Sequence, residues 1–237
     1  MSRAEVELLV KLPHEVADAA SVLEPEATTM LQERIDARGL PEAYTQHPIV
    51  RDTADMVMPW GIYMDALPYS LVDSVLGVWL INVVTNTRYI IALVRKRLTC
   101  KCGCKGWCTC WPLLKLLHWS IRAMSEGISP ASRHDGRPWE PADGDRFSAA
   151  GSPLRMRGAI IRLKGDWAEL CERLGFPTWA SGLRPCFCCA AAPDDFYTTV
   201  GVSLVDLPWH VNTPHEYDEA CARCEVWVDL TDDTRDR

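Results

Sequence analysis

Apolar residues fall into short runs in the middle of the chain, and the pattern of these runs predicts strands. Residues 56–65 form an apolar run that ends in Asp65, and Pro59 marks its entry or a sheet edge. Residues 75–84 and 89–94 are rich in Val, Ile, Leu, Trp and Tyr, and a Thr-Asn-Thr segment joins them. The pattern predicts three strands, of which the second and third form an antiparallel hairpin.

Helical patterns lie on both sides of these strands. Residues 16–37 have a composition compatible with a helix, which we expect to end at Gly39. Between residues 113 and 124, apolar side chains recur every three or four positions. We expect this second helix to begin at Pro112 and to end at Gly127, because proline suits a first helical turn and glycine a C-terminal cap.

The order of the predicted elements indicates the fold class. A polar loop over residues 128–153 leads to a fourth strand at residues 154–164 and a short helix at residues 167–174. A strand reached through a helical crossover normally pairs in parallel with its neighbour. The sequence therefore predicts an α/β protein of the α+β kind with a mixed sheet, in the β-β-β-α-β-α order of a ribonuclease-H-like core.

We expect three segments along the chain. Residues 1–50 form a helical, acidic lead-in, and residues 51–185 form the ribonuclease-H-like core with a cysteine-rich insertion at residues 100–110. Residues 186–237 hold a cysteine knuckle and an acidic C-terminal segment.

Two acids stand at the ends of predicted strands. Asp65 ends the first strand and Asp166 follows the fourth, and these strands are neighbours in the expected sheet. Two facing carboxylates repel each other unless a divalent cation lies between them, and Mg²⁺ prefers oxygen ligands. Asp65 and Asp166 are therefore candidate catalytic ligands of Mg²⁺. The alternative is that Asp65 is a turn residue and Asp166 a helix N-cap.

A paired magnesium site needs a further acid. The candidates come from later in the chain and remain alternatives: Glu169, Glu216, Glu219 and Glu225. Glu216 and Glu219 lie in a segment that we expect to open as a helix, with Thr213 as its N-cap.

The chain has 11 cysteines, and ten of them fall into two groups. Two C-x-x-C pairs at Cys186, Cys189, Cys221 and Cys224 have the spacing of a structural zinc site with a long inserted loop, and Cys188 is an alternative ligand. The denser group offers five candidate ligands: Cys100, Cys102, Cys104, Cys108 and Cys110. Three or four of these thiols can bind one ion, with His118 as another donor, and a purely structural loop is the alternative. Cys171 stands alone and is expected to be buried.

The net charge of −7 is unevenly distributed. Residues 190–237 hold eleven acids and three arginines, so the rest of the chain is close to neutral. Residues 74–125 contain eight basic residues and no acid. We expect DNA to bind there through a set of side chains that includes Arg88, Arg95, Lys96, Arg97, Lys101 and Lys105. The alternative is a solvated face without a ligand.

The sequence also indicates where in the cell the protein is located. The N-terminus lacks the basic start and apolar core of a secretory signal, and the apolar stretch at residues 75–94 is interrupted at residues 85–88. We expect a nuclear or cytoplasmic protein that is not secreted and has no membrane partner. A homo-oligomer is compatible with the sequence.

Three segments resemble a known family. Residues 155–169 (RMRGAIIRLKGDWAE), 174–177 (LGFP) and 184–189 (RPCFCC) look like a part of the CACTA-type and Plavaka-like DDE transposases. The resemblance covers roughly residues 56–190. It implies a ribonuclease-H-like core with an inserted cysteine knuckle, in which Asp65 and Asp166 are the first two catalytic acids and Cys186 and Cys189 belong to the knuckle.

The candidate site residues and the family resemblance together indicate a function. With the resemblance, we expect a transposase-derived DNA-binding or DNA-processing domain that, if active, cleaves or transfers phosphodiesters with Mg²⁺ and is stabilised by Zn²⁺. The alternative is a non-catalytic, zinc-stabilised protein-interaction module whose acidic C-terminus binds a basic partner.

Overall fold

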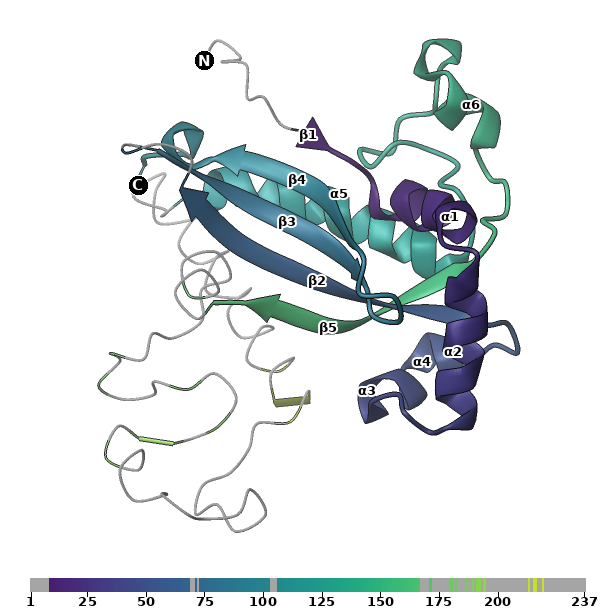
Figure 1. The fold of residues 1–237 in the computed structure, drawn as a ribbon. Coiled ribbons are helices and arrows are strands. Elements are labelled where there is room, and N and C mark those ends of the chain that lie inside the picture. The colour runs from purple at the N-terminus through teal and green to yellow at the C-terminus, as the bar shows by residue number, and fades with distance from the viewer. Residues whose placement is uncertain are drawn as a thin grey trace. The chain divides into compact units, whose positions relative to one another are not determined.

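The fold is described by a computed structural model, which covers residues 9–68, 71, 73–102 and 106–166 and single positions between 171 and 219. The chain divides into two compact units, Met1–Arg173 and Leu174–Arg237. All helices and strands named below belong to the first unit (Figure 1). None of the helices in the described part of the chain is long and apolar enough to cross a membrane.

The first unit is built on a mixed sheet, which confirms the predicted mixed α/β class. Its strands are β1 (Leu9–Val10), β2 (Val57–Pro68), β3 (Ser74–Asn82), β4 (Arg88–Arg95) and β5 (Arg157–Gly165). They are ordered β1-β4-β3-β2-β5 across the sheet. Strands β2, β3 and β4 pair antiparallel, and β5 pairs parallel with β2. The four predicted strands, the antiparallel hairpin and the parallel pairing of the fourth strand are therefore confirmed, and β1 is an additional edge strand.

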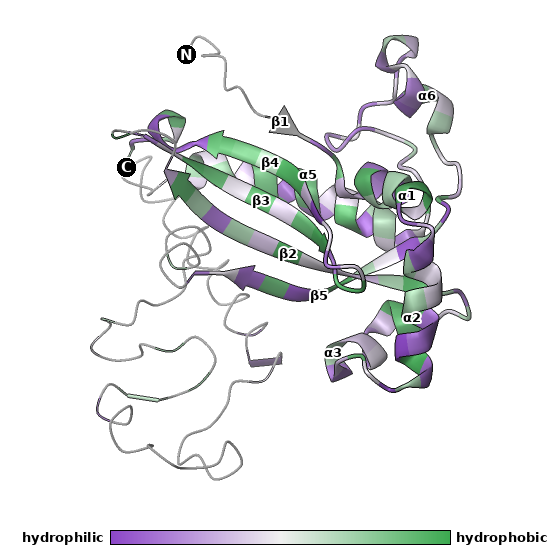
Figure 2. Cartoon of the chain, in the orientation of Figure 1, coloured by the Kyte–Doolittle hydropathy of each residue, from purple (hydrophilic) through white to green (hydrophobic). Residues whose placement is uncertain are grey.

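Helix α5 (Trp107–Glu126) carries the chain across the sheet from β4 toward β5. Its buried side chains, among them Leu113, Leu117 and Met124, pack into the core. Figure 1 shows the helix lying along one face of the sheet. Gly158 of β5 permits this approach, because a Cβ atom there would lie 2.9 Å from Met124 Cγ. Figure 2 shows that β3 and β4 are largely apolar, whereas the C-terminal half of β5 is mostly hydrophilic.

The predicted start of this helix at Pro112 is wrong. The helix begins at Trp107, after a turn in which Gly106 adopts a left-handed φ of 87°. Pro112 lies inside the helix, where it has no N–H to donate to the preceding turn. The predicted end is confirmed, because Gly127 caps the helix with a φ of 74°.

The N-terminal region forms two main helices where the composition predicted one. Helix α1 (Pro13–Leu23) and helix α2 (Glu26–Asp36) are separated at Pro25, and the short helices α3 (Glu42–Thr45) and α4 (Pro48–Arg51) follow. Proline disfavours a helical conformation in the preceding residue, and Glu24 indeed leaves the helix at φ −124° and ψ 64°.

The break between α1 and α2 puts a carboxylate into the core. Glu24 is only 7% exposed. It accepts hydrogen bonds from Asn82 Nδ2 at 3.1 Å, from Thr85 Oγ1 at 2.5 Å and from the Tyr89 hydroxyl. Burial and the hydrogen bond to Glu24 raise the pKa of Tyr89, so this phenol stays a donor. The buried carboxylate thereby ties α1 to the β3–β4 hairpin.

Helix α1 is also joined to α5. The buried ring of His14 lies with Nδ1 2.7 Å from the Ser120 hydroxyl, and the same hydroxyl oxygen accepts the His14 backbone N–H at 3.1 Å. Burial lowers the pKa of His14, which favours a neutral ring in this contact.

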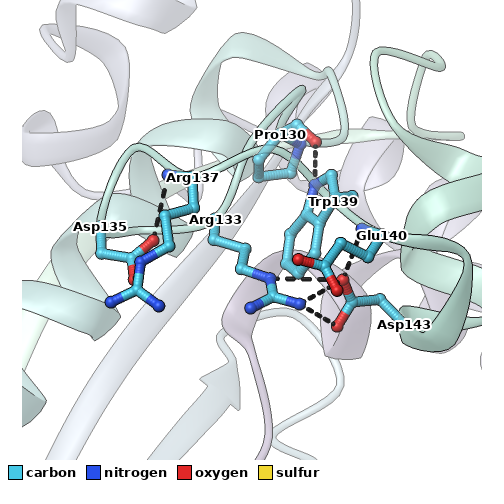
Figure 3. Close-up of polar contacts among 7 residues, drawn as sticks. All are labelled: Pro130, Arg133, Asp135, Arg137, Trp139, Glu140 and Asp143. Carbon is cyan, nitrogen blue, oxygen red and sulfur yellow. Dashed lines mark hydrogen bonds and ion pairs between the residues drawn. The ribbon is translucent and has the colours of Figure 1, made fainter.

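The polar segment between α5 and β5 is held by ion pairs (Figure 3). Arg133 contacts both carboxylate oxygens of Asp143, at 2.9 and 2.7 Å. The indole of Trp139 donates to the Pro130 carbonyl at 2.8 Å. The backbone N–H of Glu140 and the Arg133 guanidinium lower the pKa of Asp143. This network gives order to a segment whose helical structure is limited to the 3₁₀ turn η2 (Pro141–Asp143) and helix α6 (Asp145–Ala149).

Two further ion pairs join this segment to α1. Arg146 binds Glu15 at 2.6 Å and Arg155 binds Asp18 at 2.6 Å. These residues line an open groove of about 520 Å³. Because three acids of the groove, Glu15, Asp18 and Asp143, are engaged by arginines, we interpret it as a structural junction.

The role of Glu24 can be tested by mutation. Replacing Glu24 with Ala leaves the Asn82 amide and the Tyr89 hydroxyl without their acceptor, so we expect the free energy of unfolding to fall by about 2–4 kcal/mol. Urea denaturation measures the change. The matched control is Glu33→Ala, an exposed glutamate of α2, which should change stability by less than about 0.5 kcal/mol. A similar effect of both substitutions would contradict a stabilising role for the buried carboxylate.

Candidate functional site

The two predicted catalytic aspartates follow a pair of residues that lie side by side in the sheet. In the parallel pairing of β2 with β5, Met64 is the partner of Gly165. Asp65 and Asp166 are the next residues on the two strands. Neighbouring strands lie about 4.8 Å apart, so the paired residues directly before the two aspartates are separated by about that distance.

A β-bulge sets this alignment. Trp60 pairs with Ile160, but Gly61 pairs with Arg162, so β5 contains one extra residue. If the register of Val57 to Trp60 continued without the bulge, Asp65 would lie opposite Gly165, and Asp166 would lie one position further along. A shift of one residue turns a side chain to the other face of the sheet. Because of the bulge, Asp65 and Asp166 therefore directly follow a pair of residues, Met64 and Gly165, that lie opposite each other.

Tyr63 orients one of the two carboxylates. Its hydroxyl donates a hydrogen bond to Asp65 Oδ2 at 2.6 Å. This hydrogen bond is the main reason why the pKa of Tyr63 is raised, and the negative charges of Asp65 and Asp166 add to the effect. The phenol thus remains protonated, and Asp65 accepts from it.

Aromatic rings surround this end of β2. The rings of Tyr63 and Trp79 lie 5.3 Å apart. The indole of Trp79 folds over Gly77, the residue that pairs with Asp65 on β3, since a Cβ at Gly77 would lie 2.1 Å from the ring. Gly77 therefore makes room for the ring beside Asp65.

Two basic residues outside the predicted DNA-binding set, Arg162 and Lys164, lie on the same face as Tyr63. Arg162 pairs with Gly61 and Lys164 pairs with Tyr63, and both side chains are exposed. Arg162 and Lys164 occupy alternate positions of β5, so they point to one face of the strand. This alternation is visible in the sequence. Arg162 and Lys164 lie outside the acid-free residues 74–125, on which the predicted DNA-binding set is based.

The predicted DNA-binding residues lie in different environments. The guanidinium of Arg88 lies 6.0 Å above the Tyr63 ring, on the face that also holds Asp65. Arg95 and Arg97 bind Asp73 at 3.3 and 3.2 Å, and the Asp73 side chain is only 5% exposed. Lys96 lies in the 3₁₀ turn η1 (Lys96–Leu98) and Lys101 is exposed. Lys105 lies outside the described residues.

Three thiols of the dense cysteine group come together. The sulfur atoms of Cys100, Cys102 and Cys108 all lie within 4.8 Å of one another, so these three thiols can hold a metal ion. The Sγ atoms of Cys102 and Cys108 are 3.8 Å apart. A tetrahedral ion with metal–sulfur bonds of about 2.3 Å holds its sulfurs about 3.8 Å apart, whereas a disulfide needs about 2.05 Å. The spacing therefore suits two corners of a thiolate metal site.

The start of α5 fixes this group. The backbone N–H of Cys100 donates to Thr109 Oγ1 at 2.9 Å, which holds the incoming chain against the first turn of the helix. Cys110 is not part of the triad and is buried in the hydrophobic core at 3% exposure. Cys104, the remaining candidate ligand, lies outside the described residues.

The other predicted site residues belong to the second unit or lie outside the described residues. Cys186 and Cys189 are half-buried, whereas Cys188, Cys221 and Cys224 lie outside the described residues, as do Glu169 and Glu225.

The predicted N-cap at Thr213 is confirmed. The Glu216 backbone N–H approaches Thr213 Oγ1 at 3.3 Å, and the Thr213 backbone N–H donates to Glu216 Oε2 at 2.8 Å. Glu216 is therefore engaged in capping its helix.

Comparisons with models of protein families, with curated proteins and with solved structures found no match to this chain. The functional conclusions therefore rest on the geometry of two groups. One group is the pair Asp65 and Asp166 with its tyrosine and cations. The other is the thiol triad before α5.

The thiol triad can be tested with cobalt. In a chain whose Cys186, Cys189, Cys221 and Cys224 are replaced by Ser, we expect one Co²⁺ to bind with a thiolate-to-metal charge-transfer band, because the triad remains. Adding Cys108→Ser should weaken binding on the order of tenfold or more. Adding Cys171→Ser instead is the control and should leave the titration unchanged. A band that survives Cys108→Ser at full strength would contradict the assignment.

Proposed function

We propose that this chain is a nucleic-acid-processing domain with a ribonuclease-H-like core, related to the CACTA-type and Plavaka-like transposases. In this proposal Asp65 and Asp166 bind Mg²⁺ and the domain cleaves or transfers phosphodiesters of DNA. The observation that carries the proposal is the register of β2 and β5, in which the two acids follow the paired residues Met64 and Gly165.

The strand order supports the ribonuclease-H-like assignment. An antiparallel run of three strands is followed by a helix and by a fourth strand that pairs in parallel with the first of the three. This is the order that the sequence predicted for such a core. The resemblance of residues 155–169 to the transposases adds to this support, because its aspartate is Asp166.

The chemistry of the donors fits a hard divalent cation. Two carboxylates at neighbouring backbone positions offer oxygen ligands and repel each other without a cation. When bound, Mg²⁺ polarises a phosphoryl oxygen and lowers the pKa of an attacking water or hydroxyl.

The surrounding side chains have roles in this proposal. Tyr63 holds one oxygen of Asp65 and leaves the other oxygen for the ion. Arg162 and Lys164 share the face of the strand on which Asp166 follows, and they can bind the phosphates that flank the reacting one. Arg88 extends this positive face beyond Tyr63.

A second candidate function is favoured by the thiol triad. The triad suits a structural Zn²⁺ site, and a protein stabilised in this way can be a non-catalytic interaction module. In that case the acidic residues 190–237 would bind a basic partner, and the sheet would serve as a scaffold.

Nicking of supercoiled plasmid DNA separates the two candidates. With Mg²⁺ or Mn²⁺ present, we expect the parent chain to nick the plasmid. Asp65→Asn or Asp166→Asn should lower the rate at least about a hundredfold, because each removes a charge that stabilises the transition state. Gel densitometry measures the rate.

The control substitution is Asp52→Asn, which removes an exposed carboxylate at the C-cap of α4 and should leave the rate unchanged. Urea denaturation confirms that each variant is folded. Equal rates in the parent and in both catalytic variants would refute the proposed nuclease site and leave the interaction module.

A further inference from the structure

The solvent face of α5 carries an unusual set of side chains. Positions three or four residues apart share one face of a helix. On α5 the exposed residues at this spacing are Trp107, Trp111, Lys115, His118 and Arg122. The buried residues Leu113, Leu117 and Met124 occupy the opposite side, toward the sheet. We call these five exposed residues the α5 stripe.

The two tryptophans of the stripe stack on each other in solvent. Their ring centroids are 5.2 Å apart with an interplanar angle of 25°. Trp107 is 42% exposed and Trp111 is 45% exposed, although large aromatic side chains are normally buried. Lys115 Nζ lies 5.1 Å from the centre of the Trp111 ring. The helix thus presents a column of two indoles and an ammonium along its axis.

The charge of the stripe identifies the occupant. Residues 107–125 contain no acid, and Lys115 and Arg122 add two positive charges. Glu126, which binds Arg122 at 2.9 Å, is the first acid after them. A ligand that complements this surface needs flat rings and a regular negative charge.

Single-stranded nucleic acid has both properties. Its bases expose the faces that stack on aromatic side chains, and its phosphates bind lysine and arginine. A duplex hides its base faces inside the helix. The core of a protein interface is normally depleted of lysine, which makes a protein partner a poorer match.

The stripe lies apart from the aspartate pair. Met64 contributes to the core that α5 covers, so its neighbours Tyr63 and Asp65 point to the other face of the sheet. We infer that the α5 stripe is a binding surface for single-stranded nucleic acid, with Trp107 and Trp111 as stacking partners and Lys115 and Arg122 as phosphate contacts. This surface deepens the proposed function by adding a second contact with nucleic acid, but it needs no catalysis by Asp65 or Asp166.

Fluorescence anisotropy with a labelled oligothymidylate of about 20 nucleotides tests the inference on the full chain, without added divalent ions. We expect Trp111→Ala to weaken binding about tenfold, and Trp111→Phe to restore most of it, because phenylalanine also stacks. Lys115→Gln should weaken binding less and reduce its salt dependence between about 50 and 200 mM.

The matched control is Phe147→Ala, which removes an aromatic side chain of α6 that is 46% exposed and lies outside the stripe. It should leave binding unchanged. Circular dichroism shows whether each variant keeps its helices. Equal affinities for the parent, Trp111→Ala and Phe147→Ala would overturn the inference. Binding of the parent to vesicles of phosphatidylserine and phosphatidylcholine without binding to the oligonucleotide would overturn it as well.

Asp65→Asn separates this inference from the proposed nuclease site. We expect this variant to bind the oligonucleotide as tightly as the parent does. A chain that binds the oligonucleotide through the stripe but nicks no plasmid would support the inference and refute the nuclease site. A chain that nicks through Asp65 but binds equally with and without Trp111 would do the reverse.

Discussion

The parallel pairing of β2 with β5 is the constraint on which the rest of the structure depends. A parallel partner cannot be reached by a tight turn, so the chain must cross the sheet between β4 and β5, and α5 makes most of that crossing. The crossing brings Gly158 of β5 under the helix, where a larger residue would meet Trp60 and Met124. The same pairing, shifted by one residue at the bulge, aligns Asp65 with Asp166. Fold and candidate site thus follow from a single strand pairing.

The elements around this pairing hold it in place with buried polar contacts. Glu24 binds side chains of the β3–β4 hairpin, and His14 binds Ser120 of α5. Both contacts start from α1, so the N-terminal helix connects the sheet with its covering helix. The exposed tryptophans of α5 and the thiol triad are close in sequence, because Cys108 lies between Trp107 and Trp111. A metal ion at the triad would therefore fix the first turn of the helix that presents the stripe.

Much of this architecture can be predicted from the sequence, because buried strands consist mostly of apolar residues and are visible as apolar runs. The four main strands, the hairpin and the cap at Gly127 were predicted from local composition alone. The break at Pro25 lies within a segment of helical composition, and the start of α5 at Trp107 depends on the left-handed turn at Gly106, so the apolar pattern predicts neither. The bulge in β5 depends on contacts between strands 100 residues apart, which no local pattern reveals. For the same reason the sequence identifies Asp65 and Asp166 as candidate ligands but does not show that they directly follow paired residues of the two strands.

The central claim is that Asp65 and Asp166 bind one divalent ion. The most direct measurement is the anomalous difference density of a crystal of the full chain soaked in Mn²⁺, which replaces Mg²⁺ at oxygen sites. The account predicts a peak within about 2.0–2.3 Å of a carboxylate oxygen from each aspartate. Density bound to only one of the two aspartates, or to neither, would contradict it.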